Sequence, residues 1–227
     1  SLLWWQSLTF HWFAPILERG NEKKTLDRVD LELVPLPENL STDAVFDRFQ
    51  HFWKNENNKK SPSLVRALAY AFGRDYIIAG LLKCIHDVAV FVGPITLHHI
   101  IVFLRDPSAP LYYGLFWTMF VTTSQIAMSL CLRHYFFHCY KTGLRFRTAL
   151  AVAVYRKALR LASSERHVRY SSGEITNLMS IDAQRLQDLT TYLHSIWSSP
   201  LQIALSLLFL YRQLGASSLG GVLVIVI

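Results

Sequence analysis

Three ionisable side chains lie close together in an otherwise apolar stretch of the sequence. Lys83, His86 and Asp87 are spaced i, i+3 and i+4, so a helix would place them on one face. Ionisable groups inside a membrane are costly and usually face a cavity or each other. Two hypotheses follow. Either Lys83 and Asp87 form a structural ion pair, or Lys83 and His86 provide a basic lining for the anionic end of a ligand.

A second group combines apolar and aromatic residues at the same helical spacing. Leu132, Tyr135 and Phe136 stand at i, i+3 and i+4. Such residues can pack against neighbouring helices or contact the apolar body of a ligand, and the spacing alone leaves both interpretations open.

The histidines and the remaining polar residues do not indicate enzymatic chemistry. His134 and His138 are i, i+4, and a further pair lies at 98–99. Apart from Cys131 and Cys139, neither group has a cysteine or carboxylate at ligand spacing, so we predict no metal site. The chain contains no Ser/His/Asp or paired-carboxylate arrangement, and we predict no catalytic residue.

The segments that contain these residues are predicted to be membrane-spanning helices. The chain has 227 residues, of which 52% are hydrophobic and only 17% are charged. Crossing a bilayer takes about 20 mainly apolar residues, and the stretches 76–104, 111–132 and 189–211 are long enough. A fourth apolar stretch begins at Leu219, and we expect the chain to be a fragment that ends inside it. Buried helices of a soluble protein would lack a polar face to cover them.

The distribution of charge predicts the orientation of these spans. Twenty of the 23 Lys and Arg residues lie in segments 1–75 and 133–188, whereas the connection 105–110 is short and net neutral. The positive-inside rule places the two basic segments in the cytoplasm and the tip of the first hairpin outside. The sequon at Asn39 would then carry no glycan. Alternation of charged and uncharged stretches is typical of a membrane protein and argues against nucleic-acid binding.

The second span continues well beyond the membrane. Segment 111–163 contains no proline, and its only two glycines are Gly114 and Gly143. A helix of this length would measure about 80 Å against a hydrocarbon core of about 30 Å. We therefore predict a long cytoplasmic extension, with a break near Gly143 as the alternative.

A short capped helix is predicted beyond that extension. Ser171 and Glu174 match a capping box, and Ser180 with Asp182 resembles a second helix start. We expect a short transverse helix at 171–180, followed by a separate long helix that returns to the membrane. Its apolar face would need a partner domain to cover it and consists of Ile175, Leu178 and Met179.

The N-terminal part is predicted to form a linker and an elbow. Segment 1–61 begins with an aromatic amphipathic run, suited either to a membrane interface or to an ordinary packed helix. It includes a helix at 42–53 behind the cap Ser41. Segment 62–75 would lie along the cytoplasmic face as an elbow helix, and 76–227 would form the membrane domain. The aromatic residues suited to the interface are Trp4, Trp5, Phe10 and Trp12.

Several passages resemble subfamily C of the ATP-binding-cassette transporters, the multidrug-resistance-associated proteins. The matching passages, in chain order, are TFHWFAPILERG from Thr9, KCIHD from Lys83, FVGP from Phe91, AVYRKAL from Ala153, GEITNLMSIDAQR from Gly173 and IWSSPLQ from Ile196. The likeness covers nearly the whole chain and is more specific for the subfamily than for any substrate.

The resemblance implies a partial type I ABC-exporter transmembrane domain, all α-helical, preceded by a lasso-like linker. It also implies two nucleotide-binding domains and a second transmembrane domain in the same polypeptide, in the plasma or vacuolar membrane. ATP and magnesium belong to those nucleotide-binding domains, because this chain has no G-x-x-x-x-G-K-[ST] phosphate loop. The residues implied to couple to a nucleotide-binding domain are Gly173, Glu174, Ile175, Leu178, Met179 and Asp182.

The resemblance further implies export of amphipathic organic anions such as glutathione, glucuronate or sulfate conjugates. It assigns Lys83 and His86 to the anion-binding half of a substrate cavity and Asp87 to holding the helix. Leu132 and Phe136 match residues of the apolar half, where we also place Tyr135, whereas Arg133 departs from the family pattern. The alternatives are a regulatory or channel-type member of the same subfamily and a non-transporting membrane scaffold.

Overall fold

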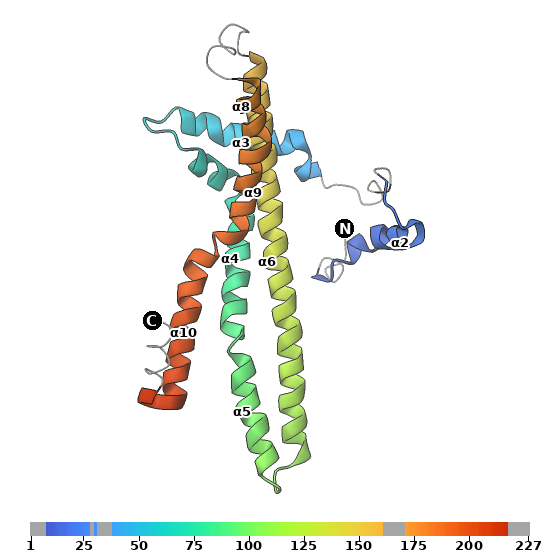
Figure 1. The fold of residues 1–227 in the computed structure, drawn as a ribbon, viewed down its shortest axis with the longest axis vertical. Coiled ribbons are helices and arrows are strands. Elements are labelled where there is room, and N and C mark those ends of the chain that lie inside the picture. Colours follow the sequence, from blue (N-terminus) through green and yellow to red (C-terminus); the bar gives the residue numbers. More distant parts are fainter. Residues whose placement is uncertain (1–7, 28–29, 31–37, 161–170, 218–227) are drawn as a thin grey trace. The chain divides into compact units, whose positions relative to one another are not determined.

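The computed structural model describes residues 8–27, 30, 38–160 and 171–217, and every regular element in them is helical (Figure 1). The all-α expectation is therefore confirmed for the described residues. In chain order the elements are η1 (His11–Phe13), α2 (Ala14–Lys23), η3 (Glu38–Leu40), α3 (Thr42–Asn57), α4 (Leu64–Ala89), α5 (Val92–Arg105), α6 (Leu111–Arg160), α8 (Ser172–Asn177), η4 (Leu178–Asp182), α9 (Ala183–Tyr192), α10 (Ser195–Leu214) and η5 (Gly215–Ser217).

Among the described residues, three helical segments are long and apolar enough to cross a membrane, as the sequence predicted. They are Leu64–Arg105, Leu111–Arg160 and Ser172–Leu214. The middle one is the single helix α6 of 50 residues, about 75 Å long at about 1.5 Å per residue. The alternative break near Gly143 does not occur. The predicted fourth span, from Leu219, lies outside the described residues.

The first predicted span is two helices rather than one. α4 ends at Ala89, a turn occupies Val90 and Phe91, and α5 begins at Val92. Pro94 explains the interruption, because a proline ring clashes with the carbonyl four residues earlier, here that of Val90, and provides no N–H to bond it. In the first turn of α5 that missing N–H costs nothing. The elbow segment is helical and forms the beginning of α4, without a break before the span.

The helices that follow α6 correct one expectation and confirm another. The capping box is present: Ser171 Oγ accepts from Glu174 N at 3.1 Å, and Glu174 Oε2 accepts from Ser171 N at 2.8 Å. However, α8 does not end before a separate helix, because it continues through the π-helical turn η4 into α9. Ser180 is not a cap, since its hydroxyl donates back to the Thr176 carbonyl at 2.7 Å. The long return is instead interrupted at Leu193–His194, between α9 and α10.

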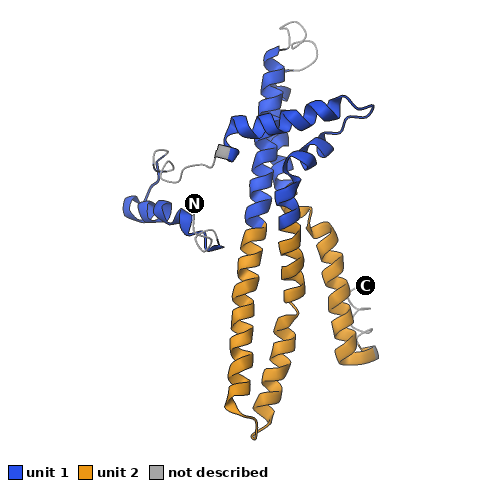
Figure 2. Ribbon diagram, turned by 180° about the vertical axis from the view of Figure 1, so that it is seen from behind, with its two compact units in different colours: residues 1–78, 136–189 blue, residues 79–135, 190–227 orange. Residues whose placement is uncertain are grey.

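The chain divides into two compact units, shown in Figure 2: residues 1–78 with 136–189, and residues 79–135 with 190–227. In the first unit, α3 packs on the beginning of α4 and the end of α6. Ser41 caps α3 by accepting from Ala44 N at 3.3 Å, as predicted. Alanines let the helices approach closely around the aromatic side chains of this core, whose buried members are Val45, Phe49, Ala67, Leu68, Ala71, Phe72 and Ala149.

Ion pairs in the first unit connect the same helices. Glu56, near the end of α3, is 2% exposed and pairs with Lys59 at 2.5 Å and with Arg66 of α4 at 2.9 Å. Asp75 of α4 pairs with Arg145 of α6. The Glu56–Arg66 pair connects α3 to α4, and the Asp75–Arg145 pair connects α4 to α6.

The N-terminal aromatic run is only partly described, and Trp4 and Trp5 lie outside the described residues. Phe10 and Trp12 lie near α6, with ring centroids 5.4 Å and 6.2 Å from that of Phe137. Whether this run also meets a membrane interface stays a prediction.

In the second unit, α5 and α6 form a hairpin held by aromatic contacts. The His99 ring stacks on Trp117 with centroids 4.1 Å apart, and His99 Nδ1 lies 3.2 Å from the Tyr113 hydroxyl. A Cβ added at Gly114 would lie 2.4 Å from Phe103 Cε1, so the lack of a side chain at Gly114 makes room for the Phe103 ring.

Candidate functional site

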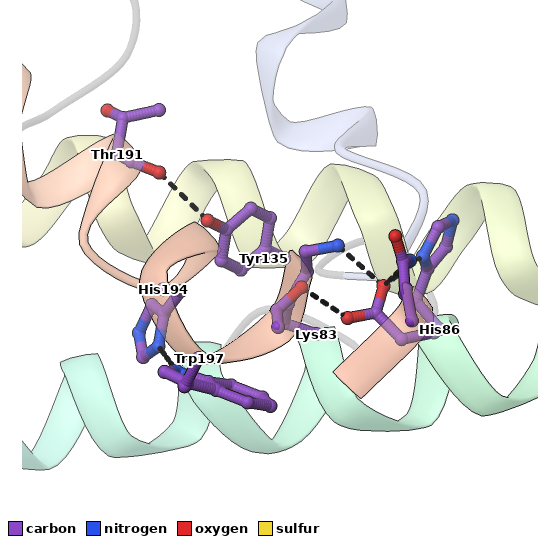
Figure 3. A network of polar contacts seen from close by, with 9 residues as sticks. Lys83, His86, Tyr135, Thr191, His194 and Trp197 are labelled. Carbon is purple, nitrogen blue, oxygen red and sulfur yellow. Dashed lines mark hydrogen bonds and ion pairs between the residues drawn. The ribbon is translucent and has the colours of Figure 1, made fainter. Parts of the chain in front are cut away.

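The second unit contains a buried carboxylate surrounded by hydrogen-bond donors. Asp87 of α4 is 0% exposed. Lys83 Nζ donates to its Oδ1 at 2.5 Å, and His86 Nδ1 lies 3.2 Å from the same oxygen (Figure 3). The helical spacing read from the sequence therefore brings these three side chains together.

Two further donors come from α10, a helix more than 100 residues later in the chain. Ser198 Oγ donates to Asp87 Oδ2 at 2.6 Å, and Gln202 Nε2 donates to Oδ1 at 2.7 Å. Ser198 and Gln202 are i, i+4, so α10 presents both from one face. Asp87 thus connects α4 to α10 in the second unit.

This arrangement balances a charge that would be costly alone. A buried carboxylate is stabilised only when it is paired and its lone pairs accept hydrogen bonds. Lys83 compensates the charge, while its side chain keeps 14% of its area exposed. The ammonium has three N–H donors, of which one bonds Asp87, so the Lys83–Asp87 pair predicted from spacing does form.

Tyr135 is placed at the interruption between α9 and α10. It is 2% exposed, and its hydroxyl donates to the Thr191 carbonyl at 2.9 Å (Figure 3). In a continuous helix that carbonyl would accept from the backbone N–H of residue 195. Tyr135 therefore satisfies an acceptor that the break leaves without its helical partner.

His194 occupies the same break and packs against α4. Trp197 Nε1 donates to His194 Nδ1 at 3.1 Å, which assigns the ring proton to Nε2 when the imidazole is neutral (Figure 3). A Cβ added at Gly80 would lie 2.7 Å from His194 Cε1. The absence of a side chain at Gly80 thus makes room for the histidine ring.

An apolar cavity of about 370 Å³ is lined by residues of α4, α5 and α10. Its walls are the stretch from Val88 to Ile95 and the stretch of α10 from Leu205 to Arg212. Arg212 is the one charged residue of the lining. Ligand sites are commonly concave, mostly apolar and supplied with a few polar groups, and this cavity has that composition, although Lys83 is not among its lining residues.

The other predicted residues are distributed over both units. Leu132 is half-buried on α6 in the second unit, and Arg133 beside it is exposed. Phe136 is exposed and belongs to the part of α6 in the first unit. Lys83, His86 and Tyr135 thus lie in one unit, and Phe136 lies in the other.

The residues predicted for coupling lie along α8 and η4, in the first unit. Gly173 and Glu174 are exposed, while Ile175 and Met179 are half-buried. Leu178 is 43% exposed. Asp182, the last residue of η4, has its Oδ1 3.8 Å from Arg185 Nη1.

Residues 76–227 match the family described as ABC transporter transmembrane region. The chain belongs to this family. This identity agrees with the resemblance drawn from the motifs and with the three membrane-crossing segments of the structure.

Relatives of this ABC transporter transmembrane region include several subfamily C members. ABC transporter C family member 8 of Dictyostelium discoideum is 42% identical over 216 residues, which is 94% of this chain and 13% of that protein. Metal resistance protein YCF1 of Saccharomyces cerevisiae is 34% identical over 241 residues, 97% of this chain and 16% of that protein. Human ATP-binding cassette sub-family C member 2 is 38% identical over 217 residues, which is 93% of this chain and 14% of that protein. The subfamily C resemblance is confirmed, and the chain spans a small part of these relatives.

The sequence alone did not identify every residue of the site around Asp87 in this ABC transporter transmembrane region. Trp197, Ser198 and Gln202 were read only as part of a matching motif, and His194 received no role. Polar side chains in an almost uncharged membrane helix usually hydrogen-bond across helices, and this signal could have singled out Ser198 and Gln202.

Proposed function

We propose that this chain forms part of the substrate pathway of an ATP-driven exporter of amphipathic organic anions, such as glutathione, glucuronate or sulfate conjugates. Lys83 and His86 contact the anionic end of the substrate. Leu132, Tyr135 and Phe136 remain proposed for its apolar body, with Tyr135 acting mainly through the shape of the α9–α10 break.

The observation that carries this proposal is the position of Lys83 beside the shared carboxylate. Asp87 accepts hydrogen bonds from α10 as well as from Lys83. The ammonium is therefore not the sole donor to that carboxylate, and it retains N–H groups for a second anion. A cation in a low-dielectric membrane site attracts anions strongly.

The adjoining cavity supports the same substrate class. Its apolar walls suit an aromatic or aliphatic body, and its one charged lining residue, Arg212, is basic. A ligand that is apolar at one end and anionic at the other matches both features.

The remaining organisation is proposed from family membership. Residues 1–61 act as a lasso-like cytoplasmic linker, 62–75 as an elbow, and 76–227 as part of the membrane domain, in a plasma or vacuolar membrane. α8 and η4 dock on a nucleotide-binding domain, which binds ATP and magnesium and lies outside residues 1–227.

ATP-dependent uptake into inside-out vesicles that contain the complete transporter tests the substrate class. Lys83→Met should raise KM for an anionic conjugate about tenfold to a hundredfold, because a hydrogen bond to a charged group contributes about 1.5–3 kcal/mol. Since this change also strands Asp87, surface expression is measured alongside. The double variant, Lys83→Met with Asp87→Asn, should recover expression but not anion uptake, and the uptake of neutral substrates should be unchanged.

Arg105→Met is the matched control, because it removes one exposed positive charge from the outer hairpin. It should leave the KM for anions unchanged. Recovery of anion uptake in the double variant would reduce Lys83 to half of a structural pair and overturn the proposal. An ATP-gated current without any ATP-driven uptake would favour the channel-type or regulatory alternative instead.

A further inference from the structure

We infer that Ser198 and Gln202 are positioning residues that let Lys83 move between Asp87 and an anionic substrate. This inference rests on the proposed function. In this role, side chains of α10 determine how readily the Lys83 ammonium of α4 can leave Asp87 and bind the anion.

The geometry that suggests this role is the sharing of one carboxylate by two helices. Lys83 Nζ and Gln202 Nε2 both bond Asp87 Oδ1, at 2.5 Å and 2.7 Å. Ser198 Oγ bonds Oδ2 at 2.6 Å and is itself 1% exposed. Asp87 therefore keeps a donor on each oxygen even when Lys83 is removed from the network.

The members of the ion pair differ in how far they can move. Asp87 has a short side chain, is fully buried and is held from α10, whereas Lys83 has a flexible four-carbon stem and a partly exposed side chain. Lys83 is thus the member that a ligand can reach. Its departure would strand a buried carboxylate if Ser198 and Gln202 did not remain bonded to it.

A selective consequence follows for the substrate. If either α10 donor is lost, Asp87 depends more on Lys83 and holds the ammonium more tightly. An anionic substrate must then compete against a stronger internal partner, whereas a neutral substrate does not use the ammonium. Loss of the donor should therefore weaken anion binding alone.

The test is uptake by vesicles containing the complete transporter, with one anionic conjugate and one neutral substrate measured in parallel. Gln202→Leu should raise KM for the anion about tenfold, the ratio that corresponds to about 1.4 kcal/mol. Maximal velocity and the KM of the neutral substrate should stay unchanged, as expected when the bound anion and the transition state lose the same binding free energy. Ser198→Ala, which changes little volume, should act in the same direction and decides the matter if Gln202→Leu fails to reach the membrane.

Gln213→Leu is the matched control, because Gln213 lies at the exposed end of the same helix. It should leave both KM values unchanged. A rescue experiment then separates positioning from packing: Asp87→Asn added to Gln202→Leu or Ser198→Ala removes the carboxylate that retains Lys83, so the anion KM should fall back toward its original value.

Three results would overturn the inference: no change in anion KM, an equal rise for both substrates, or no recovery in the double variant. Lys83→Met distinguishes this failure from failure of the proposed function. If Lys83→Met raises the anion KM and neither α10 variant does, only the positioning role is wrong. If Lys83→Met has no effect on anions, the substrate role of Lys83 fails as well.

Discussion

The Ser198 hydroxyl donates a 2.6 Å hydrogen bond to Asp87 Oδ2 and so joins α10 to α4 across 111 positions of sequence. Lys83 completes the arrangement from within α4. Asp87 therefore joins the two helices and also bonds the ammonium that we propose to contact the substrate, so the effects of changes there on stability and on uptake must be measured separately.

Asp87→Leu should destabilise the contact between α4 and α10. It strands the partly buried Lys83 ammonium and removes the acceptor of Ser198, and breaking a buried pair costs about 3–5 kcal/mol. Hydrogen exchange of the α10 amides in the purified transporter should accelerate accordingly. Asp106→Leu, in the exposed loop between α5 and α6, is the control and should leave α10 protected. Equal protection of α10 in both variants would mean that Asp87 does not hold the helix.

Tyr135→Phe should loosen the α9–α10 break while keeping the ring in place. The change removes the hydroxyl that satisfies the Thr191 carbonyl, and hydrogen bonds between membrane helices contribute about 0.6–2 kcal/mol. Exchange of amides at 191–195 reports the effect. Tyr140→Phe, at an exposed position of α6, provides the control. If both variants exchange alike, the hydroxyl of Tyr135 is not part of what holds the break.

Gly80→Ala should destabilise the second unit by about 1–3 kcal/mol, the usual range for overpacking. The added methyl group would lie 2.7 Å from His194 Cε1, so the ring at the break must shift. Gly73→Ala, on the same helix with nothing within 4 Å of its Cβ, should instead stabilise by about 0.4–1 kcal/mol. Melting temperatures of the two purified variants should therefore move in opposite directions, and a parallel shift would contradict the packing argument.

The α3–α4 hairpin should lose protection in acid because of Glu56. The hydrogen bond from Lys59, together with the charge of Arg66, lowers the pKa of Glu56 below its ordinary value of 4.5. A lowered folded-state pKa means that the contribution is present above the ordinary value and is lost as the pH falls through the lower one. The protection factors of the α3 amides, which correct for the slower intrinsic exchange in acid, should therefore fall as the pH falls below about 4.5. In Glu56→Gln this acid-dependent part should disappear, and an identical pH profile in both proteins would refute the assignment.

Leu178→Asp should uncouple ATP hydrolysis from transport while the membrane helices still insert. The proposed docking surface on α8 and η4 includes this exposed leucine, and a charge there is costly to bury against a partner domain. Uptake and ATPase activity are measured together in vesicles. Asn177→Asp adds the same charge at the neighbouring position without removing an apolar side chain. Unchanged substrate-stimulated ATPase in Leu178→Asp would contradict docking through this residue.

The sequence by itself determined the helical class, the three membrane-crossing segments and two helix starts. These features depend on short-range physics. Apolar runs of sufficient length partition into a bilayer, α6 contains no proline to interrupt it, and Ser41 and Ser171 bond backbone groups only three residues away. The Lys83–Asp87 pair was accessible for the same reason, because one helical turn brings both onto one face.

Only the tertiary structure decided what surrounds that pair. Ser198 and Gln202 reach Asp87 because α10 is rotated to present them, and rotation depends on packing, such as His194 against Gly80. Ser180 is a different case, because its hydroxyl can cap a helix or bond back within one. The local pattern allows both outcomes, and the structure shows the bond back to the Thr176 carbonyl within a return that continues as helix.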